Sequence, residues 1–111
     1  MAKDIVIQEI NKFFIAQGFE ELLINNRTVF KSKDGGYYLI SKSGKSSYYL
    51  EDAQTLEEAE NCLYEDMAAY QISLGINSLI DEIKNDIKKY ILKNKANITS
   101  DAETTIFRYA N

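Results

Sequence analysis

The sequence predicts an α+β domain with an N-terminal helix, a four-stranded antiparallel meander, then two helices and a short tail. Three observations predict this fold. The hydrophobic period is helical before Gly18, changes to two between Phe19 and Leu50, and becomes helical again from Thr55. Because no repeat, linker or low-complexity tract interrupts the chain, residues 1–111 are expected to form one domain.

The first helix is expected over about residues 3–17, because apolar residues recur there at the i, i+4, i+7 and i+8 positions of one helical stripe. The stripe consists of Val6, Ile10, Phe13, Phe14 and Gln17. Gly18 follows and supplies the left-handed residue that commonly ends a helix.

Four strands are expected over residues 19–24, 27–33, 36–42 and 45–50, separated by the turn signals Asn25-Asn26, Asp34-Gly35-Gly36 and Ser43-Gly44. Pairing through two-residue loops gathers apolar side chains on one face, namely Leu23, Phe30, Tyr37, Leu39, Tyr48 and Leu50. The other face collects Leu22, Ile24, Val29, Tyr38, Ile40 and Tyr49 with Arg27, Lys31, Lys33 and Lys42. Adjacent residues alternate faces, so a one-residue slip in register would invert this assignment.

Two helices are expected after the meander. The first begins at Thr55, which forms a capping box with Glu58, and its buried stripe is Leu56, Ala59, Leu63, Met67 and Tyr70. A break at 73–75 separates it from a helix over about 78–94, capped by Asn77 or Ser78, with the stripe Ile80, Ile83, Ile87, Tyr90 and Ile91. The tail at 98–111 fits either a short helix or a strand.

Charge is segregated along the chain, although the net charge is only −4. Residues 27–45 hold five basic residues and one acidic residue, whereas residues 51–66 hold seven acidic residues and no basic one. A helix N-terminus favours acids, which explains Glu57 and Glu58. It does not explain Glu65 and Asp66, which also lack a basic i+4 partner. The acidic segment is therefore either a solvated helix face or a docking surface for a basic partner.

The tyrosine-rich sheet face is a second candidate surface. If helices cover only one face, Tyr38 and Tyr49 lie with Ile40 on the open one, and aromatic residues with a basic rim are common at the centre of interfaces. The alternative is that a helix or the tail covers this face.

Enzymatic chemistry is not expected. The chain has no histidine, the usual acid–base group at neutral pH. Cys62 lies among acids that disfavour a thiolate, and is interpreted as a semi-buried packing residue. No cofactor is expected, and no metal site either, because the acidic residues belong to a predicted helix and not to a converging loop. Ser43-Gly44-Lys45-Ser46 lacks the context of a phosphate-binding loop. A sequence pI near 4.8 argues against a nucleic-acid partner.

A cytoplasmic location without a membrane partner is expected. The N-terminal residues lack the apolar core of a signal peptide, and no apolar run approaches the roughly 20 residues of a membrane span. A single cysteine fits a reducing compartment.

The stretch "YYLEDAQTLEEAENCLYEDMAAYQISLGINSLIDEIKNDI" resembles a small bacterial family of immunity proteins from polymorphic toxin systems. The resemblance covers about residues 36–92. It is carried by Glu51, Ala53, Glu57, Glu58, Ala59, Glu65, Asp66, Tyr70, Leu79 and Ile83. After the Glu65-Asp66 pair, this chain has Met67 and Ala68 where family members tend to have a glycine and another acid.

The resemblance implies a non-catalytic protein that binds a cognate toxin domain and occludes its active site. The expected partner-binding residues are Glu51, Asp52, Glu57, Glu58, Glu65 and Asp66, with Tyr38 and Tyr49 as the competing surface. Two other functions stay open. One is a phage-encoded inhibitor of a nucleic-acid enzyme, and the other is a scaffold that self-associates through Tyr38, Ile40 and Tyr49. A monomer or weak dimer is expected.

Overall fold

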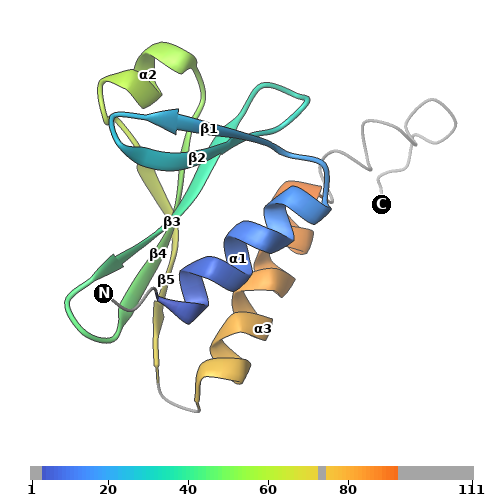
Figure 1. Ribbon diagram of the computed structural model, residues 1–111, viewed down its shortest axis with the longest axis vertical. Coiled ribbons are helices and arrows are strands. Elements are labelled where there is room, and N and C mark those ends of the chain that lie inside the picture. The colour runs from blue at the N-terminus through green and yellow to red at the C-terminus, as the bar shows by residue number, and fades with distance from the viewer. Residues whose placement is uncertain (1–3, 73–74, 93–111) are drawn as a thin grey trace, which may run out of the picture.

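Five antiparallel strands in the order β1-β2-β3-β4-β5 form one sheet, and three α-helices complete an α+β fold (Figure 1). The computed structural model describes residues 4–72 and 75–92, so the predicted tail at 98–111 lies outside them. The elements are α1 (Ile5–Ala16), β1 (Glu20–Ile24), β2 (Arg27–Lys31), β3 (Tyr37–Ser43), β4 (Ser47–Ala53), α2 (Leu56–Glu60), β5 (Glu65–Gln71), α3 (Ile76–Asp86) and the π-helix η1 (Ile87–Leu92).

Helix α1 begins and ends with side-chain and backbone caps. The Asp4 carboxylate accepts hydrogen bonds from the N–H groups of Val6 and Ile7 at 2.9 and 3.1 Å. At the other end, Gly18 has a φ of 93°, and the N–H of Phe19 donates to the Phe14 carbonyl in a Schellman motif. The Phe14 and Phe19 rings lie 5.0 Å apart. The predicted helix end at Gly18 is confirmed.

The β1–β2 hairpin has the predicted two-residue turn. Asn25 and Asn26 have φ values of 54° and 64°, and Ile24 pairs with Arg27. Two positive φ values are the signature of a type I′ turn, which matches the twist of the flanking strands.

The predicted faces of β3 are inverted. Phe30 pairs with Tyr38 and Ile40 pairs with Leu50, whereas two-residue loops would have opposed Phe30 to Leu39. The reason is loop length, because residues 32–36 separate β2 from β3 and residues 44–46 separate β3 from β4. Relative to a two-residue loop, each of these loops shifts the strand pairing by an odd number of residues, which exchanges the two faces of the following strand. The second exchange reverses the first, so β4 keeps its predicted faces and only β3 has them inverted.

The predicted helix from Thr55 to Tyr70 is wrong beyond its first turns. Its capping box is present in a shifted form: Thr55 Oγ1 accepts from the Glu58 N–H at 3.1 Å, but Glu58 Oε1 accepts at 2.8 Å from the N–H of Gln54, the residue before the N-cap, instead of from that of Thr55. The helix α2 then ends at Glu60, and residues 65–71 form the edge strand β5 against β4. This fifth strand is the main correction to the predicted four-stranded meander.

A β-bulge explains why β5 resembles a helix in sequence. Leu50 pairs with Ala68 and Glu51 pairs with Asp66, so Met67 is an extra residue. Met67, Ala68 and Tyr70 consequently all pack against the same core cluster. The bulge breaks the period of two that normally marks a strand.

Helix α3 begins earlier than predicted, at Ile76, after Gly75 with a φ of 108° and without a side-chain cap. The proposed caps Asn77 and Ser78 lie inside the helix. Its core stripe is otherwise as expected, because Ile80, Ile83, Ile87 and Ile91 are buried. Tyr90 is the exception, since 48% of it is exposed.

Two apolar clusters lie on opposite faces of the sheet. The larger one joins β2–β5 to α1 and α3, which lie side by side in Figure 1. The smaller one lies under α2 and contains Val29, Tyr37, Leu39, Ala53 and Ala59. The first half of strand β3 is buried on both faces. Helix α2 lies at the end of the sheet farthest from the start of α3 (Figure 1).

Candidate partner-docking site

Carboxylates face each other across β4 and β5. Glu51 pairs with Asp66, and Asp52 pairs with Glu65. Because the side chains of successive strand residues point to opposite faces, the Asp52–Glu65 pair faces the side of α1 and α3, and the Glu51–Asp66 pair faces the other side. Like charges directly opposite one another destabilise a sheet. The strand register therefore places two repulsive pairs at one end of the sheet, one on each face.

The Asp52–Glu65 pair opens into a hollow of about 520 Å³ beside α2. Its lining residues include the carboxylates of Asp52, Glu58 and Glu65, together with Leu63 and Tyr64. Burial raises the pKa of Asp52, and the negative charges of Glu65 and then Glu58 raise it further. The hollow is thus an acidic region where the negative charge of Asp52 is unfavourable in the absence of a cation.

Tyr64, one of the residues that line this hollow, also carries an unpaired polar atom. Within the described ranges, its hydroxyl oxygen is buried without a hydrogen-bond partner. An unsatisfied buried polar group costs about 1–3 kcal/mol, so this hydroxyl lowers the stability of this end of the sheet.

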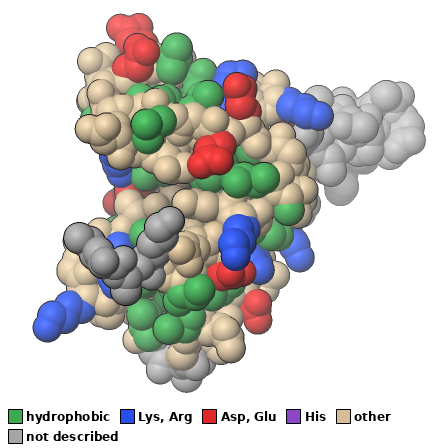
Figure 2. All heavy atoms as spheres, viewed as in Figure 1, with side chains coloured by type: hydrophobic (Ala, Val, Ile, Leu, Met, Phe, Trp, Pro, Cys, Tyr) green, Lys and Arg blue, Asp and Glu red, His purple; other side chains and the backbone are tan. Residues whose placement is uncertain are grey.

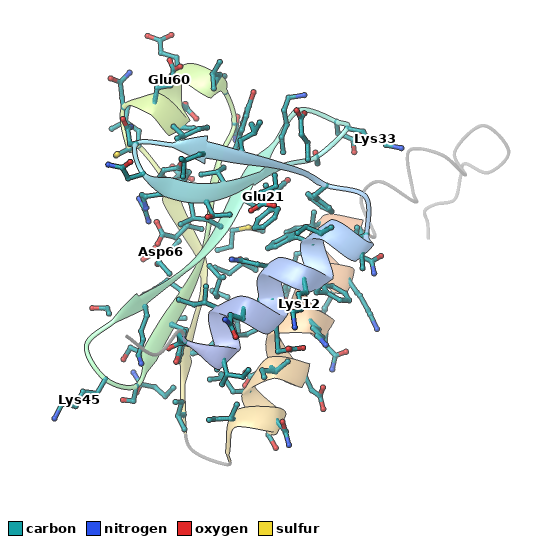
Figure 3. All side chains as sticks on the ribbon, in the orientation of Figure 1. Lys12, Glu21, Lys33, Lys45, Glu60 and Asp66 are labelled. Carbon is teal, nitrogen blue, oxygen red and sulfur yellow. The ribbon has the colours of Figure 1, made fainter. Side chains whose placement is uncertain are left out.

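The Glu51–Asp66 pair is partly neutralised. Glu51 accepts a short hydrogen bond from Ser41 Oγ, and Arg27 Nη2 lies 3.8 Å from Glu51 Oε2. The guanidinium of Arg27 also lies over the Tyr64 ring, 5.2 Å from its centroid. Arg27 therefore links the β1–β2 hairpin to the acidic end of the sheet. Asp66 points away from α1 and α3 in Figure 3.

The predicted acidic helix does not exist as one surface. Glu57 and Glu58 lie in the first turn of α2, and Glu58 is engaged in the capping box. Glu65 and Asp66 lie on β5 and are exposed. Six predicted acidic residues still gather at the junction of α2, β4 and β5, but the sheet register brings them together instead of a helical stripe.

Tyr38 and Tyr49 do not share an open face, contrary to the sequence-based expectation. Tyr38 pairs with Asp52 and packs against Phe14 and Phe19 under α1. Tyr49 pairs with Ser41 on the other face and is half-buried. Ile40, the third member of that predicted surface, is buried in the larger cluster. A self-association surface built from these three residues is therefore excluded.

A second hollow of about 340 Å³ shares Asp52, Ala53 and Gln54 with the first. The rest of its lining comes from the residue before β1, the β2–β3 loop, β3 and the end of η1, and includes Phe19, Asp34, Gly36, Tyr38, Ile91 and Leu92. The sequence pattern predicts a hairpin turn at Asp34-Gly35-Gly36 and no binding role for it. Nothing in the local pattern signals that residues 91–92, more than fifty positions later, lie beside this turn.

Three further sequence predictions concern a metal site, Cys62 and membrane spans. No group of three or more Cys, Asp or Glu side chains in residues 4–72 and 75–92 is arranged to hold a metal ion. Cys62 is exposed instead of semi-buried, and its Sγ lies 3.7 Å from Asn25 Nδ2. None of the described helices is long and apolar enough to cross a membrane.

The face that carries α1 and α3 has a mixed surface. In Figure 2, acidic and basic side chains lie scattered among small apolar patches on this face, and neither charge dominates it. Lys42 Nζ, for example, lies 3.0 Å from Asp4 Oδ2. The basic strands predicted from the sequence are thus partly neutralised by acidic neighbours.

Comparisons with known proteins identify no relative: no family model, no curated protein and no solved structure matches this chain significantly.

Proposed function

We propose that this protein is a non-catalytic binding protein whose acidic junction of α2, β4 and β5 docks a basic surface of a partner protein. The observation that carries the proposal is the cross-strand pairing of Asp52 with Glu65, beside Glu58 of α2 in the lining of one hollow. Among the described residues, no salt bridge joins Asp52, Glu58 or Glu65 to a basic side chain. Such an arrangement costs stability, and a cationic partner would relieve that cost.

The partner we propose is a cognate toxin domain, which the protein neutralises as an immunity protein. The resemblance of residues 36–92 to immunity proteins of polymorphic toxin systems supports this choice, as does the acidic junction. A toxin that acts on phosphate-bearing substrates has a basic surface around its active site, and clustered carboxylates would speed association with it. Occlusion of the toxin's active site then requires no catalytic group on this chain.

The test starts from the gene that lies immediately upstream. Its C-terminal domain is produced with and without this protein, and cell survival and complex formation are measured. We expect the domain to be toxic alone, and co-expression to restore growth through a stable complex. Absence of both rescue and complex formation would refute the immunity function.

The docking surface is tested by association rates measured with that domain at low and high salt. The double variant Asp52→Asn/Glu65→Gln removes two charges from the acidic junction, whereas Glu20→Gln/Glu21→Gln removes two from exposed positions on β1. We expect the first variant to associate several-fold more slowly, with a weaker salt dependence, and the second to resemble the wild type. Equal effects of the two variants would show that the acidic junction does not dock the partner.

A further inference from the structure

The hollow of about 340 Å³ beside the β2–β3 loop combines three kinds of wall. Phe19, Ile91 and Leu92 form an apolar side, Tyr38 adds an aromatic ring, and Asp34 and Asp52 add two carboxylates. Its volume is at the small end of the range for ligand pockets. A cavity of this composition suits a ligand with an apolar stem and a cationic end.

The β2–β3 loop is held in place by its own hydrogen bonds. Ser32 is buried, and its Oγ accepts from the N–H groups of Asp34 and Gly36 at 3.2 and 3.3 Å. The Ser32 N–H donates to the Gly36 carbonyl at 2.8 Å, and the Gly35 N–H donates to the Ser32 carbonyl at 3.1 Å. The carboxylate-bearing wall is thus largely organised before a ligand binds.

Tyr38 lies so close to Gly36 that a side chain at position 36 would displace the Tyr38 ring. A β-carbon on Gly36 would lie 2.5 Å from the Tyr38 hydroxyl oxygen and 2.8 Å from its Cζ atom. On its other side, the Tyr38 ring stacks on Phe14 with centroids 6.5 Å apart and meets Phe19 edge-on at 5.9 Å. The ring is therefore fixed between the aromatic core and the loop. Burial raises the pKa of Tyr38, followed by the charges of Asp52 and Asp34, so both carboxylates act on this hydroxyl.

The apolar wall comes from the π-helix at the end of α3. In η1, Ile91 is buried and Leu92 is half-buried, and both line the hollow. π-helical turns are rare and occur frequently at functional sites. Two successive apolar residues of η1 thus line the same cavity.

We infer that this hollow binds one arginine side chain of the partner protein. Two carboxylates can accept charge-assisted hydrogen bonds from the planar guanidinium, and an aromatic ring and an aliphatic wall suit its weakly hydrated plane and its stem. Arginine is also enriched among the residues that dominate interface energies. The inference rests on the proposed function, since it names an anchor of the same docking surface; Asp52 belongs to both hollows.

The test needs no partner protein. The full chain, labelled with ¹⁵N, is titrated with Nα-acetyl-arginine methylamide and, as the uncharged isostere, with Nα-acetyl-citrulline methylamide. We expect the arginine probe to shift the amide signals of Gly35, Gly36 and Gln54, and to bind at least about tenfold more tightly than the citrulline probe.

Two variants show whether the carboxylate at the hollow is responsible. Asp52→Asn should weaken binding of the arginine probe several-fold, whereas Glu60→Gln, an equal charge change at the tip of α2, should not (Figure 3). Each variant's spectrum shows whether it keeps the wild-type fold. Equal binding of arginine and citrulline, shifts at other amides only, or insensitivity to Asp52→Asn would each overturn the inference. A failure here would leave the association-rate test of the larger acidic junction intact, so the two proposals can fail separately.

Discussion

Cys62 adopts a φ of 57°, a left-handed conformation that is unfavourable for any residue with a β-carbon. It directly follows Asn61, the C-cap of α2, and this is the position where helices most often have glycine. The N–H of Cys62 donates to the Ala59 carbonyl at 3.2 Å, and the N–H of Leu63 donates to the Glu58 carbonyl at 2.8 Å. These two bonds form the same Schellman motif that Gly18 forms after α1. The exposed thiol makes Cys62 replaceable.

Cys62→Gly should therefore raise the free energy of unfolding. Relief of the left-handed strain outweighs the extra entropy of glycine in the unfolded chain, and we expect a net gain of about 0.5–1 kcal/mol. Urea denaturation of wild type, Cys62→Gly and Cys62→Ala measures this. Both variants lose the contact between Asn25 Nδ2 and Sγ, but only glycine removes the β-carbon. A Cys62→Gly protein no more stable than Cys62→Ala would show that the strain is absent.

At the scale of elements, the edge strand β5 carries its two acids opposite two acids of β4. The same charge has the opposite effect at the start of α2, where Glu57 lies in the first turn near unpaired N–H groups. Two charge reversals within nine residues should consequently change stability in opposite directions.

We expect Glu65→Lys to raise the free energy of unfolding by about 0.3–1 kcal/mol, because it turns a repulsive cross-strand pair into an attractive one. Glu57→Lys should lower it by about 0.3–1 kcal/mol, because a cation at a helix N-terminus is unfavourable. Both residues are exposed, so packing changes little. Thermal and urea unfolding in low salt compare them. If Glu65→Lys is destabilising, the pairing of Glu65 with Asp52 does not occur in solution.

At the scale of the whole molecule, two aspartates respond to pH with opposite sign. Asp4 joins α1 to the β3–β4 hairpin, since Tyr48 Oη donates to Asp4 Oδ2 at 2.7 Å and Lys42 Nζ lies 3.0 Å from the same oxygen. Partial burial alone would raise the pKa of Asp4, but hydrogen bonds from Tyr48, the Ile7 N–H and Lys42 lower it below 3.8. Asp52 at the other end of the sheet has its pKa raised by burial, and further by Glu65 and Glu58.

These directions define the expected pH profiles. The carboxylate of Asp4 contributes stability above pH 3.8, which is lost as the pH falls through its lower native pKa. Asp52 binds its proton more tightly in the folded state. Its contribution to the free energy of unfolding therefore falls as the pH rises from 3.8 through its raised native pKa, and is constant above that pKa.

Asp4→Asn should therefore be less stable than wild type at pH 7, by about 1 kcal/mol, with a deficit that shrinks in acid. Asp52→Asn should be more stable at pH 7, by less than about 1 kcal/mol, with an advantage that disappears below pH 3.8. Urea unfolding between pH 3 and pH 7 tests both variants. Parallel profiles for the two would contradict the opposite environments of these carboxylates.

Local chemistry in the sequence was sufficient for several elements. The α1 stripe ends at a glycine, the Asn25-Asn26 turn needs two positive φ values, and the Thr55–Glu58 capping box involves residues three apart. In each case the interacting groups are neighbours in the chain, so their spacing alone determines the structure. The α+β class and most core positions of α1 and α3 follow from the same local periodicity.

Tertiary structure decided the rest, because the deciding contacts join residues far apart in the chain. Cys62 ends α2 in a left-handed conformation that its residue type disfavours. The pairing of β5 with β4, which follows this turn, offsets its cost. The bulge at Met67 hides the strand period. Two longer loops invert β3, so Tyr38 packs against the larger apolar cluster and Tyr49 does not. The acidic segment is continuous in sequence, but its cross-strand pairs depend on the register between β4 and β5. Its two hollows depend on residues that are distant in the chain, including the end of η1 beside the β2–β3 loop. The sequence pattern reveals where charges lie and which hydrophobic period a segment has. Strand register, and which distant residues line the same hollow, depend instead on the free energy of the whole packed chain.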